Sequence, residues 1–316
     1  MPLRRFLAVS AAALLLGATS ACGQEANGSS GGRLDVVTAF YPLKFLAERV
    51  GGDAVRVSQL TKPGAEPHDV ELTVRQVAEI SDAALVVYLR GFQPAVDQAV
   101  AQRSKRGFDA GEEVELLPAG EHDHEAGEEH QEGAGHEGDE HAEGGTDPHV
   151  WLDPARYAAI ADALAVRLGT IDPERAAAYT ERARTLHAEL DALNGEYAAK
   201  LKTCARREFV TSHTAFHYLA DRYSLKEIGI TGITPETEPS PQRLAEVAER
   251  AKATGATTIF FETLVSPKVA ETVAREAGVG TAVLDPIEGV DESRADYFSV
   301  MRANLTALAT ALGCSS

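Results

Sequence analysis

A chain of 316 residues, 44% of them hydrophobic, is long enough to bury two modest cores, and its formal net charge is −18. So acidic a protein is a poor candidate for binding nucleic acid or an anionic membrane surface, and it is well suited to binding cations. The charge is uneven, because residues 121–147 hold eleven Asp or Glu and no Lys or Arg.

The first 21 residues have the organisation of a secretory signal peptide. Two arginines precede the apolar run of residues 6–18, which is too short to span a bilayer as a helix. Small residues then lead into Cys22, an order that resembles a bacterial lipoprotein cleavage site. We expect Cys22 to carry a lipid anchor and residues 22–32, rich in Gly and Ser, to form a flexible tether. Plain secretion with an unmodified Cys22 is the alternative.

Residues 33–170 alternate short apolar runs with helical patterns, which is typical of a parallel sheet with crossover helices. Strands are expected at residues 34–39, 55–57, 84–89 and 114–117. Helices are expected at residues 42–50, 73–80, 94–103 and 154–169. We interpret this part as an N-terminal lobe. It contains an insertion, residues 120–147, which we expect to be disordered because it has almost nothing large and apolar to bury.

Residues 171–202 predict one helix of about 28 residues, which would be about 42 Å long and could connect two lobes. Residues 203–316 repeat the alternation. Strands are expected at residues 209–211, 226–230, 257–261 and 281–284, and helices at residues 215–223, 240–255, 266–278 and 296–312. The fold class is therefore α/β, with two parallel-sheet lobes joined by one long rigid helix.

Two cysteines follow the predicted signal peptide and Cys22. Outside the cell a pair such as Cys204 and Cys314 is usually a disulfide, which here would tie the C-terminal end to the start of the second lobe. A metal-binding thiolate pair is the weaker alternative, because neither cysteine has a nearby His or Cys.

Half of the ten histidines lie in the acidic segment at residues 121–147. They are His122, His124, His130, His136 and His141. Imidazole and carboxylate are both zinc ligands, so this segment is predicted to collect metal at low affinity. A solvated acidic linker with incidental histidines is the alternative.

Three further histidines stand at junctions between expected elements. His68 follows a turn stiffened by two prolines, His149 precedes a helix start, and His213 ends a strand. Asp285 likewise ends a strand, and ligands of open α/β sheets bind at the carboxyl ends of strands. Any one histidine alone would more often be structural, but four such residues at matching positions favour a site. Three imidazoles and one carboxylate suit Zn²⁺.

Two histidines are left out of this site. His187 lies inside the long helix with no second ligand beside it and is interpreted as a surface residue. His217 stands four residues after His213, but Thr214 occupies the position where a helical zinc-protease motif needs Glu. We interpret His217 as a structural or supporting residue.

The segments that contain these residues resemble the zinc- and manganese-binding solute-binding proteins of ABC importers. They read Pro-Gly-Ala-Glu-Pro-His-Asp-Val-Glu (63–71), Asp-Pro-His-Val-Trp-Leu-Asp-Pro (147–154), Thr-Ser-His-Thr-Ala-Phe (211–216) and Leu-Asp-Pro (284–286). Residues 238–241 and 260–263 also match, in order along the chain.

The resemblance implies a metal held in the cleft between the lobes by His68, His149, His213 and Asp285. It implies a transport function, not catalysis, with an ABC permease and its ATPase as partners. The location would be extracytoplasmic, on the outer face of the cytoplasmic membrane or in the periplasm, and we expect a monomer. Manganese members usually have Glu where His213 stands, so the resemblance favours Zn²⁺, with a manganese-binding homologue as the alternative. In some zinc members Glu or water takes the place of the fourth ligand, which is Asp285 here.

Two other functions stay open. In a secreted zinc hydrolase the three histidines would hold the metal, with Asp285 or Glu66 as the base. The sequence has no His-Glu-x-x-His motif to support this. The third possibility is an adhesin or scaffold that only stores zinc.

Overall fold

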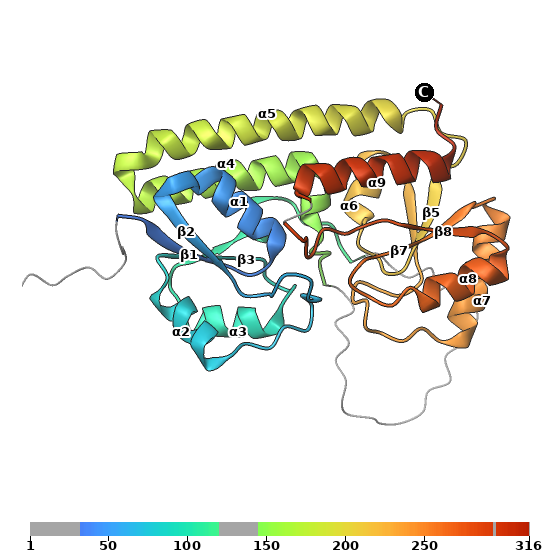
Figure 1. The fold of residues 1–316 in the computed structure, drawn as a ribbon, viewed down its shortest axis with the longest axis horizontal. Coiled ribbons are helices and arrows are strands. Elements are labelled where there is room, and N and C mark those ends of the chain that lie inside the picture. The colour runs from blue at the N-terminus through green and yellow to red at the C-terminus, as the bar shows by residue number, and fades with distance from the viewer. Residues whose placement is uncertain (1–31, 120–144, 293–294, 316) are drawn as a thin grey trace, which may run out of the picture.

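The computed structural model describes residues 32–119, 145–292 and 295–315, which form two α/β lobes bridged by long helices (Figure 1). The predicted signal peptide, Cys22 and the five histidines of the acidic segment lie outside the described residues. Within the described residues, no helix combines the length and apolar character needed to cross a membrane.

The first lobe contains a four-stranded parallel sheet in the order β2-β1-β3-β4. The strands are β1 (Leu34–Thr38), β2 (Val55–Gln59), β3 (Leu85–Tyr88) and β4 (Gly107–Asp109), and the helices are α1 (Tyr41–Gly51), α2 (Val74–Asp82) and α3 (Pro94–Arg103). The central strands β1 and β3 are buried through most of their length, as expected for a parallel sheet covered on both faces.

The strand predicted at residues 114–117 is wrong. The edge strand is β4, and a 3-10 turn, η2 (Ala110–Glu113), follows it. β4 is only three residues long and contributes one buried apolar side chain, Phe108, so its pattern is too short to recognise. Val114 and Leu116 pack against the core from an irregular segment instead.

The second lobe repeats this topology with the strand order β6-β5-β7-β8, again all parallel. The strands are β5 (Glu208–Thr211), β6 (Lys226–Gly229), β7 (Thr258–Phe261) and β8 (Gly280–Val283), and the helices are α6 (His217–Arg222), α7 (Pro241–Ala253) and α8 (Lys268–Ala277). In each sheet the strand order reverses between the two central strands, β1 and β3 in the first lobe and β5 and β7 in the second. Such a switch point places a crevice at the carboxyl ends of these strands.

Three long helices lie along one side of the molecule in Figure 1, and the longest of them runs across both lobes. They are α4 (Pro154–Ile171), α5 (Ala176–Lys200) and α9 (Tyr297–Leu312). The 25 residues of α5 make a helix about 38 Å long. Its buried residues recur every three or four positions and form one stripe: Tyr179, Ala183, Leu186, Leu190, Leu193 and Tyr197. This stripe packs against α1 and α4 of the first lobe and against α9 of the second, so the predicted joining helix is confirmed.

The helix α5 begins later than the sequence predicted. Asp172 does not cap it, because its carboxylate accepts hydrogen bonds from Arg175 (2.6 Å) and Tyr179 (2.9 Å). A 3-10 turn, η4 (Pro173–Arg175), therefore precedes α5.

Buried polar contacts hold the lobes together beside the long helices. Asp153, which is fully buried, accepts two hydrogen bonds of 2.7 Å from the Arg222 guanidinium of α6. Trp151 donates to the carbonyl of Pro286 (2.7 Å), and its own carbonyl accepts from the hydroxyl of Tyr297 (2.7 Å). One cluster of buried apolar residues draws members from both lobes. The interface between the lobes is thus part of the core.

The predicted disulfide between Cys204 and Cys314 is confirmed. It joins the segment that follows α5 to the end of α9, so it fastens the joining helix to the last helix of the second lobe.

Candidate metal centre

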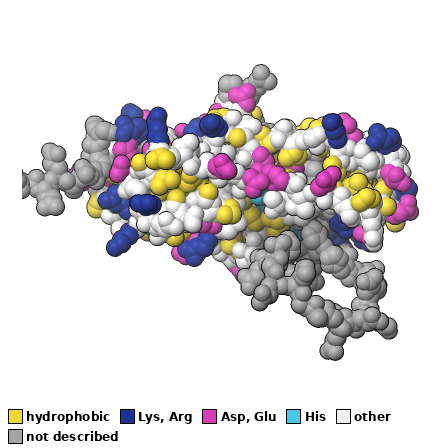
Figure 2. Space-filling view, turned by 90° about the horizontal axis from the view of Figure 1, so that it is seen from below, with side chains coloured by type: hydrophobic (Ala, Val, Ile, Leu, Met, Phe, Trp, Pro, Cys, Tyr) yellow, Lys and Arg dark blue, Asp and Glu magenta, His cyan; other side chains and the backbone are white. Residues whose placement is uncertain are grey.

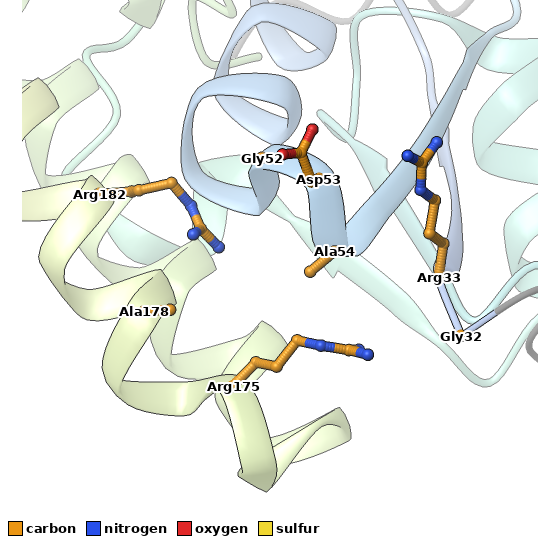
Figure 3. Close-up of a pocket in the computed structure, with 8 residues that line it drawn as sticks. All are labelled: Gly32, Arg33, Gly52, Asp53, Ala54, Arg175, Ala178 and Arg182. Carbon is orange, nitrogen blue, oxygen red and sulfur yellow. The ribbon is translucent and has the colours of Figure 1, made fainter.

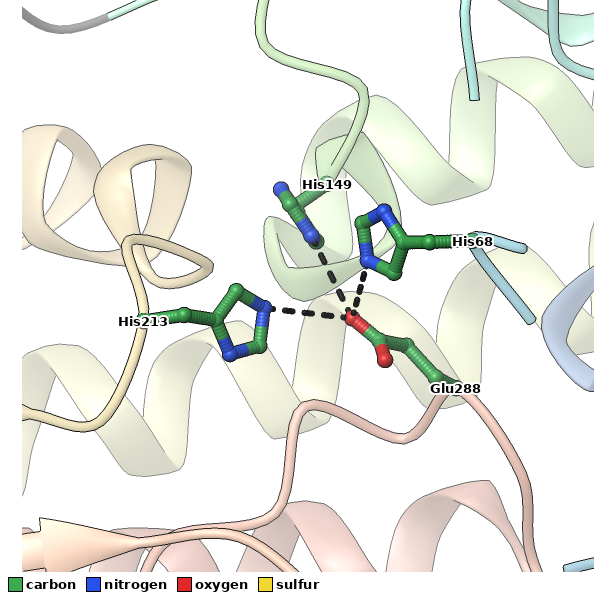
Figure 4. Close-up of side chains that lie close together, drawn as sticks. All are labelled: His68, His149, His213 and Glu288. Atoms are coloured by element: carbon green, nitrogen blue, oxygen red, sulfur yellow. Dashed lines mark hydrogen bonds and ion pairs between the residues drawn. The ribbon is translucent and has the colours of Figure 1, made fainter. Parts of the chain in front are cut away.

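Four buried side chains from four separate segments converge between the lobes (Figure 4). They are His68, His149, His213 and Glu288, and none is more than 7% exposed. One possible ligand atom from each lies within 4.8 Å of all the others. Glu288 Oε1 is 3.4 Å from His68 Nε2, 3.2 Å from His149 Nε2 and 3.4 Å from His213 Nε2.

His68 is held on the loop between β2 and α2. Its backbone N–H donates to Glu66 Oε2 (3.0 Å), and its ring packs edge-on against Phe92, 4.5 Å between centroids. Gln93, which is 1% exposed, donates to the carbonyl of Pro67 (2.8 Å) and fixes the turn that carries His68. The imidazole is therefore oriented by contacts that need no metal.

His149 directly precedes a 3-10 turn, η3 (Val150–Leu152), and its orientation is set by Asp147. Asp147 Oδ1 lies 2.8 Å from both the backbone nitrogen and Nδ1 of His149. A carboxylate only accepts, so Nδ1 carries the proton and Nε2 faces the other three ligands. The hydroxyl of Tyr218 donates to the backbone carbonyl of Asp147 (2.6 Å), which anchors this segment to the second lobe.

His213 is arranged in the same way on the second lobe. It lies two residues after β5, and its Nδ1 is 2.8 Å from Oε1 of Glu262, the residue that follows β7. Ser212 donates to the same oxygen (2.7 Å). Both carboxylates that orient the imidazoles are buried, so each histidine is fixed in one tautomer with Nε2 toward the centre.

The carboxylate of the cluster is Glu288, not the predicted Asp285. Asp285 turns back into its own loop, where it accepts hydrogen bonds from the backbone of Ile287 (2.7 Å) and from Thr263 (3.0 Å). These hydrogen bonds occupy both carboxylate oxygens of Asp285. The longer side chain of Glu288 reaches the histidines instead. Sequence reasoning passed over Glu288 because it lies four residues beyond the expected end of the last strand and past the turn at Asp285 and Pro286.

The electrostatics of the cluster favour a cation. Burial lowers the pKa of His149, but its interactions with Asp147 and Glu288 outweigh burial and raise the pKa to about 9. Burial likewise lowers the pKa of His213, while Glu262 and Glu288 raise it well above its usual range. Burial raises the pKa of Glu288, yet the three imidazoles hold the pKa of that carboxyl well below its ordinary value. Buried negative charge thus surrounds the three Nε2 atoms.

Several polar atoms at the centre have no hydrogen-bond partner within the described part of the chain. They are Nε2 of His149, Nε2 of His213 and Oε2 of Glu288. Buried polar atoms are rarely left in this state, and a metal ion would satisfy all of them. Three imidazole nitrogens and one carboxylate oxygen in a compact, buried group form a donor set that fits tetrahedral Zn²⁺.

Among the described residues, His217, His187 and Glu66 lie outside the four-residue cluster. His217 Nδ1 is 3.5 Å from Asp147 Oδ2, so it supports the residue that orients His149. The side chain of His187 is 40% exposed on α5. Burial and a hydrogen bond to Glu236 raise the pKa of Glu66 to about 9, so Glu66 is protonated near neutral pH and is poorly suited to be a general base.

The centre has little contact with the surface. Seen from below, histidine side chains appear only in small areas near the middle of the molecule, with acidic side chains beside them (Figure 2). A separate pocket of about 490 Å³ is lined by the 3-10 turn η1 (Gly52–Ala54) and the start of α5 and contains none of the four residues (Figure 3). Two of its three arginines are engaged elsewhere, since Arg182 donates to the carbonyls of Val50 and Gly51 and Arg175 to Asp172.

The family model described as "Zinc-uptake complex component A periplasmic" matches residues 36–311. The chain belongs to this family. It is 34% identical over 318 residues to the high-affinity zinc uptake system protein ZnuA of Bacillus subtilis, which covers 97% of both proteins. It is 36% identical over 288 residues to the zinc-binding lipoprotein AdcA of Streptococcus pneumoniae, covering 88% of this chain but only 55% of AdcA. The chain thus spans about half the length of the AdcA proteins.

Solved structures agree with this assignment. The Zn(II)-bound ZnuA-like domain of S. pneumoniae AdcA superposes with a TM-score of 0.73 at 33% identity, covering 89% of this chain and 99% of that one. The laminin-binding protein Lmb of Streptococcus agalactiae, described as bifunctional with adhesin and metal-transporting activity, gives a TM-score of 0.76 at 33% identity, covering 88% and 99%.

Proposed function

We propose that this protein is the extracytoplasmic zinc-binding component of an ABC metal importer and that it delivers Zn²⁺ to the membrane permease. The observation that carries the proposal is the buried set of three Nε2 atoms around Glu288 Oε1, at 3.2–3.4 Å. Zinc is here the cargo, held by groups that are already oriented before it arrives.

The composition of the set supports zinc over manganese. Three imidazoles and a single carboxylate are a nitrogen-rich group, whereas manganese prefers carboxylate, carbonyl and water oxygens. The same set argues against a secreted zinc hydrolase. A catalytic zinc keeps one coordination position open for water, and here the carboxylate of Glu288 approaches all three histidines.

The location follows from the proposed signal peptide and the lipid on Cys22, which would keep the protein at the outer face of the cytoplasmic membrane. Residues 23–31 would then connect the anchor to the first lobe. In this proposal the histidines of residues 120–147 collect zinc weakly near the centre, because that segment leads directly to Asp147 and His149.

Competitive titration of residues 22–316, with Cys22 replaced by Ser, tests this function. Metal-free protein is titrated with Zn²⁺ or Mn²⁺ against a chromophoric chelator. We expect one tight zinc equivalent and far weaker manganese binding. The double variant His149→Ala/His213→Ala should lose the tight site, whereas the control His187→Ala should keep it. Tight binding that survives the double substitution would refute the site, and equal affinity for manganese would refute the specificity.

Uptake by living cells tests the transport step. Cells that lack this protein should accumulate zinc slowly from zinc-poor medium and recover with the wild-type chain but not with the double variant. Recovery with the double variant would show that delivery does not use this centre.

A further inference from the structure

The loop that carries Glu288 contains an unusual backbone conformation. Ile287, the residue directly before Glu288, has φ +63°. Among the described residues other than glycine, only Ser224 shares a positive φ. A β-branched side chain is strongly disfavoured there, so Ile287 is held by its surroundings. Its side chain is fully buried in the core cluster.

Asp285 makes the contact that fixes this conformation. Its Oδ1 accepts a hydrogen bond from the backbone N–H of Ile287 (2.7 Å), which closes a tight turn over Pro286. Its Oδ2 accepts from Thr263 (3.0 Å), in the segment after β7. Both oxygens of the carboxylate are therefore engaged within the loop and its neighbour.

Two other elements clamp the same loop. Asn304 of α9, which is 2% exposed, accepts a hydrogen bond from the backbone N–H of Asp285 (2.9 Å) and donates to its carbonyl (2.7 Å). Trp151, two residues after His149, donates to the carbonyl of Pro286 (2.7 Å). The loop is thus tied to α9 and to the segment that carries His149.

We propose that Asp285 is a positioning residue for the proposed zinc function: with Asn304 it holds Ile287 in the left-handed region and so presents the carboxylate of Glu288 to the three histidines. Asp285 acts only through Glu288. Zinc affinity in this protein then depends on a backbone turn that is set before the ion binds. Without Asp285, Ile287 should relax to a negative φ, and Glu288 would move away from the histidines.

A double-mutant cycle separates this role from direct ligation and from a merely structural role. We expect Asp285→Ala to weaken zinc binding by about 10–100-fold, the usual effect of losing a group that orients a ligand. Asp285→Asn should stay within a few-fold of the wild type, because its amide oxygen still accepts from Ile287. Glu288→Ala should weaken binding strongly, and adding Asp285→Ala to it should cause no further loss.

The outcomes are distinct. A further loss in the Glu288→Ala background would mean that Asp285 contacts the metal or supports the fold generally, and it would overturn the proposal. So would unchanged affinity in Asp285→Ala. The exposed-surface control Asp162→Ala should behave as the wild type, and circular dichroism checks that each variant is folded. If the wild type itself binds no zinc, or if tight binding survives in His149→Ala/His213→Ala, the proposed function fails instead, and these two titrations show that separately.

Discussion

The carboxylate behind His149 provides the sharpest test of how the centre is built. Replacing Asp147 with Asn keeps the size of a fully buried side chain but removes its negative charge. In the wild type one oxygen, Oδ1, receives both the backbone N–H and the Nδ1–H of His149, each at 2.8 Å. The amide oxygen of Asn still accepts, but without the charge it holds the Nδ1–H tautomer less firmly and makes Nε2 a weaker ligand.

The expected loss follows from the bond that is weakened. A hydrogen bond to a charged group contributes about 1.5–3 kcal/mol, and loss of a group that orients a metal ligand typically lowers affinity about 10–100-fold. That range corresponds to about 1.4–2.8 kcal/mol, so the two figures agree. We therefore expect Asp147→Asn to bind zinc about 10–100-fold more weakly with the stoichiometry unchanged.

The assay is competitive zinc titration, and the chain offers a matched comparison. Glu262→Gln weakens the equivalent contact to His213 (2.8 Å) on the other lobe and should produce a loss of similar size. Asp162→Asn, at the exposed partner of His187, should produce none. If a folded Asp147→Asn protein binds zinc within twofold of the wild type, the orienting role of this carboxylate is refuted.

Three further outcomes are expected. Replacing both Cys204 and Cys314 with Ser opens a loop of 110 residues and should lower the free energy of unfolding by up to about 5 kcal/mol, with little change in zinc affinity. Urea titration measures this, and an unchanged unfolding midpoint would contradict it. Zinc must displace a proton from His149, whose pKa is raised to about 9, so zinc affinity should fall steadily as pH drops below about 9. A zinc affinity that stays constant between pH 9 and 7 would contradict this. Deleting residues 121–144 should remove weak zinc equivalents from isothermal titrations and leave the tight one, so loss of tight binding would be the opposing result.

The sequence predicted the histidines of the centre better than its carboxylate. His68, His149 and His213 stand beside prolines or at strand ends, and such local features survive folding, so their convergence could be expected from the α/β pattern alone. The position of Glu288 depends on Ile287 at positive φ, which a β-branched residue adopts only under tertiary constraint. No local pattern reveals that constraint.

The orienting partners were also beyond sequence reasoning, for a different reason. Glu262 lies 49 residues from His213, and Asn304 lies 19 residues from Asp285. Both pairs form only when separate strands and helices pack. The strand β4 escaped detection because its three residues leave too short a pattern to recognise. Sequence patterns thus predicted the elements and the imidazoles, while packing decides how each ligand is held.

The arrangement of the ligands also constrains how zinc leaves. The two lobes are held by a common core, by α5 and by the buried pair of Asp153 and Arg222, none of which includes a ligand. His68 and Glu288, in contrast, sit on loops. The loop of Glu288 holds Ile287 at a strained positive φ, so a rearrangement of the loop costs less than a rearrangement of the packed helices. We therefore predict that zinc release moves the loops at residues 63–70 and 285–290 and leaves the long helices in place. Hydrogen exchange with and without zinc measures this: protection should change in the two loops and stay constant along α5 and α9. A change of protection along α5 and α9 comparable to that in the loops would mean that the lobes rotate as rigid bodies, and the prediction would be wrong.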